Sequence, residues 1–232
     1  MDNYHWVYGI NNIPRQKKYA QFGEENIFDY IFDNIGTKNK FIVDFGAGTL
    51  NSGLSNSRYL IEKGYNGLLM DGNPEEENDI IKKEFITAEN IVSLFDKYNV
   101  PKEFDFLSID IDGNDFWVLK SILESDYSPR LIVNEFNGCL SEGQLQVMKY
   151  NPTHSWGSND YYGASFEAFK HLLNEAGYSL VYQIATTNMF FIKTELVEHK
   201  DFGVTYTKNQ YHAHSPNRDW LLFHKDSKIL KK

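Results

Sequence analysis

Apolar residues follow two patterns along the chain, and the two alternate. In residues 22–36 and 165–178 they recur every three or four positions, which is typical of a helix with one buried face. In residues 41–48 and 104–110 they form short continuous runs, as in a strand buried on both faces. The predicted helices cover 22–36, 56–64, 114–125 and 165–178, the predicted strands cover 41–48, 66–74, 104–110 and 129–137, residues 84–99 contain a short strand and then a helix, and 179–195 contain two strands.

This alternation predicts an α/β fold in which helices cover both faces of a mostly parallel sheet, as in a Rossmann-like three-layer sandwich. Only about four residues join the two strands within 179–195, whereas a parallel connection needs a dozen or more. We therefore expect the last strand of the sheet to be antiparallel.

Polar residues stand where the predicted strands end. Asp44, Asp71 and Asp110 each follow an apolar run, and Glu135 lies near the end of another. Ligands of open α/β sheets bind outside the carboxyl ends of the strands. We therefore expect these four side chains to meet at one edge of the sheet and to form a ligand site there.

The segment VDFGAGTLNSG at 43–53 contains Gly46 and Gly48, but Asn51 stands where a dinucleotide-binding loop needs its third glycine. Two glycines still let the backbone approach a ligand closely, and the acid before them can contact a cationic amino group. Asp71, 27 residues after Asp44, suits the two hydroxyls of a ribose. A tight turn and a solvated acid are the alternative explanation for Asp44 and Asp71.

Together, these motifs resemble the class I S-adenosylmethionine-dependent methyltransferases, and within them the FkbM-type O-methyltransferases. The similarity spans roughly residues 15–195. The segments that carry it are AQFGEENIFDYIF (20–32), FIVDFGAG (41–48), GLLMDGNP (67–74), DFLSIDIDGNDFWVL (105–119), IVNEFN (132–137) and YYGASFEAFKHLLNEAGYSLV (161–181).

The resemblance implies a seven-stranded sheet that binds S-adenosylmethionine. It implies that the glycine loop lines the methionine and ribose of this cofactor, that Asp71 holds the ribose hydroxyls, that 87–90 face the adenine and that 21–25 lie near the entrance. The predicted cofactor-binding residues are Gln21, Asp44, Gly46, Ala47, Gly48, Asp71, Gly72, Asn73, Ala88, Glu89 and Asp110.

The segment SIDIDGND at 108–115 places three carboxylates at the mouth of a strand. It is not a calcium loop of the EF-hand type, because Asp115 occupies the position that needs Gly and Ser121 the position that needs Glu. Asn114 and Asp115 are interpreted as caps of the following helix. Asp110 and Asp112 need another compensation for their charges.

Two compensations are open for these acids. Asp110 faces the positively charged sulfonium cofactor and the acceptor, or Asp110 and Asp112 hold a Mg²⁺-like cation together with Glu135. Some sugar O-methyltransferases similar to this family use such a metal and others do not.

About 28 residues separate Phe136 from the helix at Ser165, and a connection of this length is usually functional or mobile. Its aromatic side chains suit a polar, sugar-like acceptor, although they also suit a cluster that only packs. The residues predicted on the substrate side are Asp112, Asn114, Asn137, Trp156, Tyr161 and Tyr162.

An alcohol acceptor becomes a good nucleophile only when its proton is removed. His154 is the first candidate for the catalytic base and Asp110 the second. His212 and His214 show no obvious partners and are interpreted as surface or lid residues.

The composition excludes several classes of partner. A net charge of −9 argues against nucleic-acid binding, and no apolar run approaches the length that spans a membrane. The single cysteine, Cys139, cannot form an internal disulfide and is expected to be a buried small side chain. The first residues do not resemble a signal peptide, so a cytoplasmic location is expected.

We expect one methyltransferase domain at 1–199, with an N-terminal helical extension and a substrate-side insertion at about 138–164. A C-terminal extension at 200–232 is expected to act as a lid or as a contact between the subunits of a homo-oligomer. The functional hypothesis is methyl transfer from S-adenosylmethionine to an oxygen of a small-molecule acceptor. The expected acceptor is a sugar or phosphorylated precursor of a surface polysaccharide, such as a capsule, or of a secondary metabolite. The alternatives are a nicotinamide-dependent oxidoreductase and a non-catalytic module that binds a metal or a carbohydrate.

Overall fold

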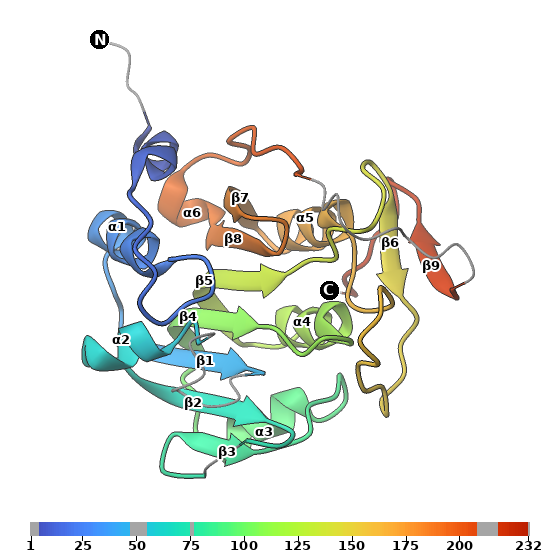
Figure 1. Cartoon of the computed structure of the whole chain (residues 1–232), viewed down its shortest axis with the longest axis horizontal. Coiled ribbons are helices and arrows are strands. Elements are labelled where there is room, and N and C mark those ends of the chain that lie inside the picture. Colours follow the sequence, from blue (N-terminus) through green and yellow to red (C-terminus); the bar gives the residue numbers. More distant parts are fainter. Residues whose placement is uncertain (1–4, 47–54, 75–76, 208–217, 232) are drawn as a thin grey trace.

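A seven-stranded sheet forms the centre of the computed structural model, which describes residues 5–46, 55–74, 77–207 and 218–231 (Figure 1). The strand order is β3-β2-β1-β4-β5-β8-β7. β8 pairs antiparallel with both of its neighbours, whereas β1 to β5 are parallel. The predicted α/β fold with an antiparallel last strand is therefore confirmed. The strands of this sheet are β1 (Phe41–Phe45), β2 (Asn66–Asp71), β3 (Ile81–Lys83), β4 (Glu103–Ile109), β5 (Ser128–Glu135), β7 (Tyr178–Ile184) and β8 (Asn188–Lys193).

Helices cover both faces of this sheet. One layer comprises the 3₁₀ helix η1 (Trp6–Asn12) with α1 (Glu25–Ile35), α2 (Arg58–Glu62) and α6 (Thr194–Val197), and the other comprises α3 (Ile91–Lys97), α4 (Asp115–Leu123) and α5 (Phe166–Glu175). None of the described helices is both long and apolar enough to cross a lipid bilayer.

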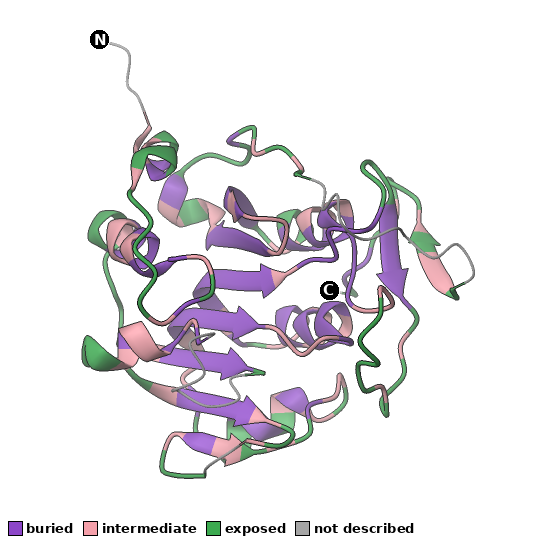
Figure 2. Ribbon diagram, viewed as in Figure 1, coloured by how far each residue is buried: buried purple, intermediate pink, exposed green. Residues whose placement is uncertain are grey.

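The strands are apolar along their length because successive side chains enter different layers. On β5, Ile132 packs in the layer of α3, α4 and α5, whereas Leu131 and Val133 pack in the layer of α1. All three are buried, as is most of the central sheet in Figure 2. A strand between two helix layers shows no polar alternation, which explains the continuous apolar runs of the sequence.

A buried ion pair closes the amino end of the sheet. The carboxylate of Asp105 on β4 accepts a hydrogen bond from Arg130 on β5 at 2.8 Å and others from the backbone N–H groups of 38–40. Arg130 also donates to the carbonyl oxygens of Ile35 and Gly36 at the end of α1. This network joins α1, β1, β4 and β5 at the edge opposite the predicted site.

Two parts of the fold differ from the sequence prediction. The third strand is 81–83, whereas the prediction placed it after residue 84. The long connection after β5 contains β6 (Leu145–Met148), which pairs antiparallel with β9 (Trp220–Phe223) from the C-terminal segment. Each of these paired strands has only four residues, and about 70 residues separate them. The local pattern of apolar residues therefore could not predict that they pair.

The described part of the C-terminal segment packs on the domain. Ile229 and Leu230 are buried in the core, and their backbone N–H groups donate to the carboxylate of Glu175 on α5 at 2.9 and 3.3 Å. Ser165 caps the same helix, with its hydroxyl accepting from the N–H of Ala168.

Candidate functional site

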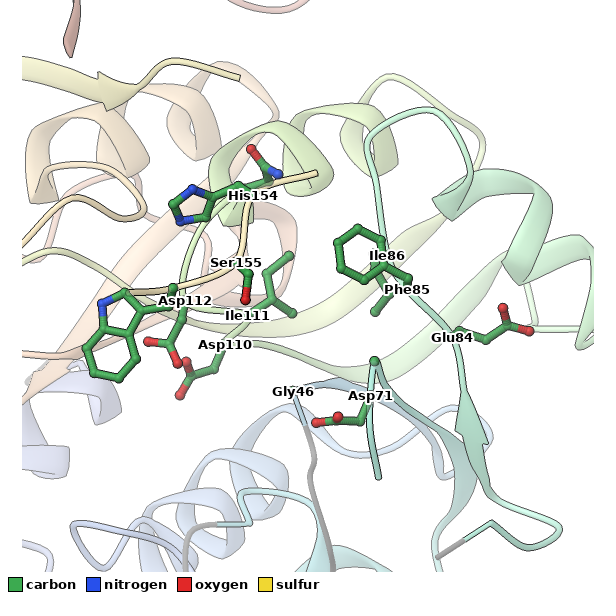
Figure 3. Close-up of a pocket in the computed structure, with 13 residues that line it drawn as sticks. Gly46, Asp71, Glu84, Phe85, Ile86, Asp110, Ile111, Asp112, His154 and Ser155 are labelled. Atoms are coloured by element: carbon green, nitrogen blue, oxygen red, sulfur yellow. The ribbon is translucent and has the colours of Figure 1, made fainter. Parts of the chain in front are cut away.

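A pocket of about 300 Å³ lies at the carboxyl ends of β1, β2 and β4 (Figure 3). Three groups of residues line it: the strand ends, the segment after β3 and part of the connection between β6 and α5. The lining residues are Gly46, Asp71, Gly72, Glu84, Phe85, Ile86, Asp110, Ile111, Asp112, Asn114, His154, Ser155 and Trp156.

Gly46 lets the ends of β1 and β4 meet at the floor of this pocket. Its φ is +71°, and a Cβ atom there would lie 1.6 Å from the carbonyl oxygen of Asp110. Any side chain would therefore push the two strand ends apart, so the position needs glycine. The N–H of Asp110 donates to the carbonyl of Phe45 at 3.3 Å, which completes the contact.

Asp44 lies near the floor without lining the pocket. It is 3% exposed, and its carboxylate is hydrogen-bonded to the side chains of Ser57 and Ser108. Burial is the main cause that raises the pKa of Asp44 to about 6; the nearby charge of Asp71 contributes to this rise, and the serine hydrogen bonds oppose it. Asp44 thus belongs to the acidic surroundings of the site.

Asp71, at the end of β2, contributes a carboxylate to the pocket. Its Oδ1 accepts the N–H of Asn73 at 2.7 Å, which fixes the turn that follows the strand. The ring of Phe85 lies against this turn, because a Cβ atom on Gly72 would be 3.5 Å from Phe85 Cδ2. Phe85 is 54% exposed and presents its ring to the pocket that it lines.

Three further carboxylates converge from β4 and β5. Asp110, Asp112 and Glu135 each offer an oxygen, and these oxygens all lie within 4.8 Å of one another. Asp112 has a φ of +51°, a left-handed conformation that Asp tolerates better than most residues. Glu135 Oε2 is buried and has no hydrogen-bond partner among the described residues.

These acids hold their protons more tightly than isolated carboxyls. Burial and, after it, the charges of Asp115, Asp112 and Asp44 together raise the pKa of Asp110 to about 8. Burial and the charge of Asp110 also raise the pKa of Glu135 well above its usual value, and burial and Asp115 raise that of Asp112. Without a cation, Asp110 therefore keeps its proton near neutral pH.

Asp115 organises the loop that carries these acids. Its carboxylate accepts the N–H groups of Ile111 and Gly113, both at 2.8 Å, so it points back into the loop. Asn114 stands at the N-cap of α4, yet its side chain makes no cap hydrogen bond and donates to the carbonyl of Asn151 at 2.7 Å. The prediction that these two side chains cap the helix is therefore wrong. The Asp115 side chain stabilises the loop before the helix, and the Asn114 side chain binds the connection between β6 and α5.

His154, Ser155 and Trp156 form the wall of the pocket that comes from this connection. The His154 ring lies on the backbone of Gly113, where a Cβ atom would be 2.6 Å from its Cδ2. Its Nε2 atom is buried and has no hydrogen-bond partner among the described residues. Trp156 is 45% exposed. This wall thus offers the aromatic face of Trp156, while the His154 ring packs on the loop that carries the acids.

Other predicted residues lie outside the pocket lining. Gln21 and Asn73 are exposed, and Ala88 and Glu89 contact the hydroxyl of Tyr150. Ala47, Gly48, His212 and His214 lie outside the described residues.

Three residues predicted on the substrate side, Asn137, Tyr161 and Tyr162, are not among the residues that line the pocket. The Asn137 side chain donates to the carbonyls of Asp160 and Tyr162 at 2.9 and 3.0 Å. The Tyr161 hydroxyl donates to the carbonyl of Asp219. Tyr162 is half-buried, and its pKa is raised by burial and by the nearby charge of Glu135.

Five lining residues escaped the sequence prediction. Ser155 lies between the predicted residues His154 and Trp156, and Ile111 lies between the predicted acids Asp110 and Asp112. Their position next to predicted site residues was the only feature of the sequence that could have indicated them. Glu84, Phe85 and Ile86 were assigned to a strand, and nothing in the apolar pattern marked them as pocket residues.

Comparison with known proteins places the chain in a family. The family model described as the methyltransferase FkbM domain matches residues 1–180. A search of curated proteins found no match. A solved structure described as an O-methyltransferase family protein from Burkholderia thailandensis is similar with a TM-score of 0.35 and 9% sequence identity. That similarity covers 78% of this chain and 58% of the other, so it spans less than two thirds of the other chain's length.

Proposed function

Because the chain belongs to the FkbM methyltransferase family, we propose that it transfers a methyl group from S-adenosylmethionine to a hydroxyl of a small, uncharged polar acceptor such as a sugar. The observation that carries this proposal is the meeting of Gly46, Asp71 and Asp110 in one pocket at the carboxyl ends of three strands. That edge is where open α/β sheets bind ligands.

The cofactor fits the described residues of this pocket. The Asp71 carboxylate can accept hydrogen bonds from the two hydroxyls of a ribose. Gly46 has no side chain, so the backbone of Asp110 can lie close to it at the floor of the pocket, beside the ligand. Phe85 and Ile86 provide apolar contact for a base, a role that the sequence prediction gave to 87–90. S-adenosylmethionine, when bound, supplies a methyl group on a positively charged sulfur, a charge that Asp110 favours.

A Mg²⁺ ion also fits the site. Asp110, Asp112 and Glu135 offer the oxygen ligands that hard cations prefer, and the unpartnered Glu135 Oε2 leaves a lone pair available. When bound there, Mg²⁺ would lower the pKa of an acceptor hydroxyl. Whether or not a metal is bound, His154 would accept the hydroxyl proton on Nε2, and the wall around it would keep the acceptor in line with the methyl group.

The charge of the pocket favours an uncharged acceptor over a phosphorylated one. Four carboxylates line it, and none of its described lining residues is Lys or Arg. The sequence of 47–54 contains no Lys or Arg either. A phosphate group would find no cationic partner among these described residues and would oppose the ionisation of Asp110, whereas sugar hydroxyls can form hydrogen bonds with the acids. Trp156 supplies the flat face on which sugar rings pack.

Two experiments test the proposal. In a thermal-shift assay, S-adenosylhomocysteine should raise the melting temperature and NAD should not. With methyl-labelled S-adenosylmethionine and Mg²⁺, a panel of free sugars should accept label in preference to the matching sugar phosphates. Stabilisation by NAD alone would favour the oxidoreductase, and labelling of only the phosphorylated sugars would contradict the charge argument.

A further inference from the structure

Two separate parts of the chain form facing walls of the pocket. We call Phe85 and Ile86 the cofactor wall, and His154, Ser155 and Trp156 the acceptor wall. In the view of Figure 3 the two lie on either side of Ile111. They come from the segment after β3 and from the connection between β6 and α5. Because these two segments are far apart in the sequence, the backbone does not couple their motions directly.

Tyr150 joins these walls through its hydroxyl. The phenol oxygen accepts the N–H of Ala88 at 3.2 Å and donates to the carboxylate of Glu89. The hydrogen bond from Tyr150 is the main reason why the pKa of Glu89 is lowered. One side chain of the acceptor side thus holds both a backbone and a side-chain group of the cofactor side.

The acceptor side is anchored on both sides of Tyr150. Trp117 Nε1 on α4 donates to the carbonyl of Met148 at 2.8 Å, and Asn114 donates to the carbonyl of Asn151 at 2.7 Å. The Tyr150 ring also lies 6.0 Å from the Trp117 ring, between ring centroids. Tyr150 is therefore a fixed point attached to α4 rather than part of a loose loop.

The segment that Tyr150 holds is itself a closed turn. The N–H of Thr87 donates to Asn90 Oδ1 at 2.8 Å, and the Asn90 side chain donates to the carbonyl of Phe85 at 2.8 Å. A displacement of Phe85 is thus passed to Asn90 and to the residues between them. Two of the four residues between them, Ala88 and Glu89, contact Tyr150.

We propose that Tyr150 is a positioning residue that couples the two walls, so that filling the cofactor side orders the acceptor side. The proposal rests on the proposed function, because it requires S-adenosylmethionine between Phe85 and the strand ends. It gives Glu89, which is predicted to contact the cofactor, a second role as the acceptor of the Tyr150 hydrogen bond. The coupling favours an order in which the cofactor binds before the acceptor.

The test uses S-adenosylhomocysteine as the probe and Tyr150→Phe as the variant, which keeps the ring and removes both hydrogen bonds. By calorimetry we expect its affinity for S-adenosylhomocysteine to fall about 3- to 10-fold, as for the loss of one or two hydrogen bonds. By hydrogen–deuterium exchange, the probe should slow exchange in both 85–90 and 149–156 of the wild type, but only in 85–90 of the variant.

Tyr127→Phe is the matched control. The Tyr127 hydroxyl also donates to a carboxylate, that of Asp96 at 2.7 Å, but neither residue lines the pocket. This control should bind the probe and transmit protection like the wild type. Glu89→Ala, which removes the acceptor of the same hydrogen bond, should behave like Tyr150→Phe and provides a second variant if that one folds poorly.

The possible results separate this proposal from the proposed function. If the wild type binds S-adenosylhomocysteine but Tyr150→Phe and Glu89→Ala bind it equally well and still protect 149–156, the coupling is refuted while methyl transfer stands. If the wild type does not bind the probe at all, the proposed function fails and takes the coupling with it.

Discussion

Two aspartates at opposite ends of β4 should respond to the same substitution in opposite ways. Asp105, at the amino end, is fully buried and receives hydrogen bonds from Arg130 and from backbone N–H groups. Asp110 follows the carboxyl end and is surrounded by other acids, so its pKa is raised to about 8. We predict that Asp105→Asn destabilises the fold and that Asp110→Asn stabilises it at pH 8.

The sign follows from proton binding. The pKa of Asp110 in the folded protein lies above its unfolded value of 3.8, so the folded state binds more protons between these values. The stability of the wild type therefore falls as the pH rises from about 4 to about 8. The asparagine variant lacks this loss, so the difference between the two proteins should grow over that range and disappear near pH 4.

The magnitude has an upper limit. Raising the pKa of Asp110 from 3.8 to about 8 corresponds to at most about 6 kcal/mol, at about 1.4 kcal/mol for each pH unit. We expect a gain of about 1–3 kcal/mol at pH 8, because the asparagine amide must also be satisfied in the same surroundings. Asp105→Asn should cost about 3–5 kcal/mol, since it leaves the buried Arg130 without its ionic partner.

Urea unfolding at pH 4, 6 and 8 in the presence of EDTA measures both differences without bound divalent cations. Methyl transfer by Asp110→Asn should be lost even where the variant is the more stable protein. A destabilised Asp110→Asn variant at pH 8 would refute the reasoning, because it would mean that the carboxylate is satisfied by protein groups, as Asp105 is.

Three further predictions address the site. Asp71→Ala should weaken S-adenosylhomocysteine binding by about 1–3 kcal/mol in calorimetry, whereas Asp96→Ala, a change of an exposed acid on α3, should leave it unaltered. Mg²⁺ should raise the melting temperature of the wild type but not of Glu135→Gln, and an equal rise in both would remove Glu135 from the metal site. His154→Asn should bind S-adenosylhomocysteine normally while labelled methyl transfer falls by about 10²- to 10⁴-fold, and unchanged transfer would assign the base elsewhere.

The layered fold could be predicted from the sequence because each central strand contacts two helix layers. Leu107 packs toward α4 while Phe106 packs toward α1, so both positions had to be apolar and the strand appeared as one run. The pairing of β6 with β9 could not be predicted in this way. It depends on contacts between Val147 and Leu221, which are far apart in the chain.

The strand ends of the site were predictable for the same topological reason. Because the strands β2, β1 and β4 are parallel, Asp71 and Asp110 lie at the same edge of the sheet regardless of the path of the loops. The connections are different, because their path depends on contacts that the sequence does not reveal. Tyr161 and Asn137 were assigned to the acceptor, yet their polar groups contact backbone carbonyls, while Phe85 lines the pocket from a segment interpreted as a strand.

The charge of the pocket also bears on how tightly a cationic cofactor and its neutral product would bind. Asp71, Asp110 and Asp112 line it, and none of its described lining residues is a Lys or Arg that could neutralise them. Carboxylates in this position interact favourably with a cationic sulfur and lose that interaction when methyl transfer leaves a neutral thioether. Under the proposed function, these acids would therefore bind S-adenosylmethionine more tightly than the neutral product. The crowding of these acids destabilises the folded protein at pH values above their ordinary pKa, and under the proposed function a cationic ligand at this edge of the sheet would relieve that cost.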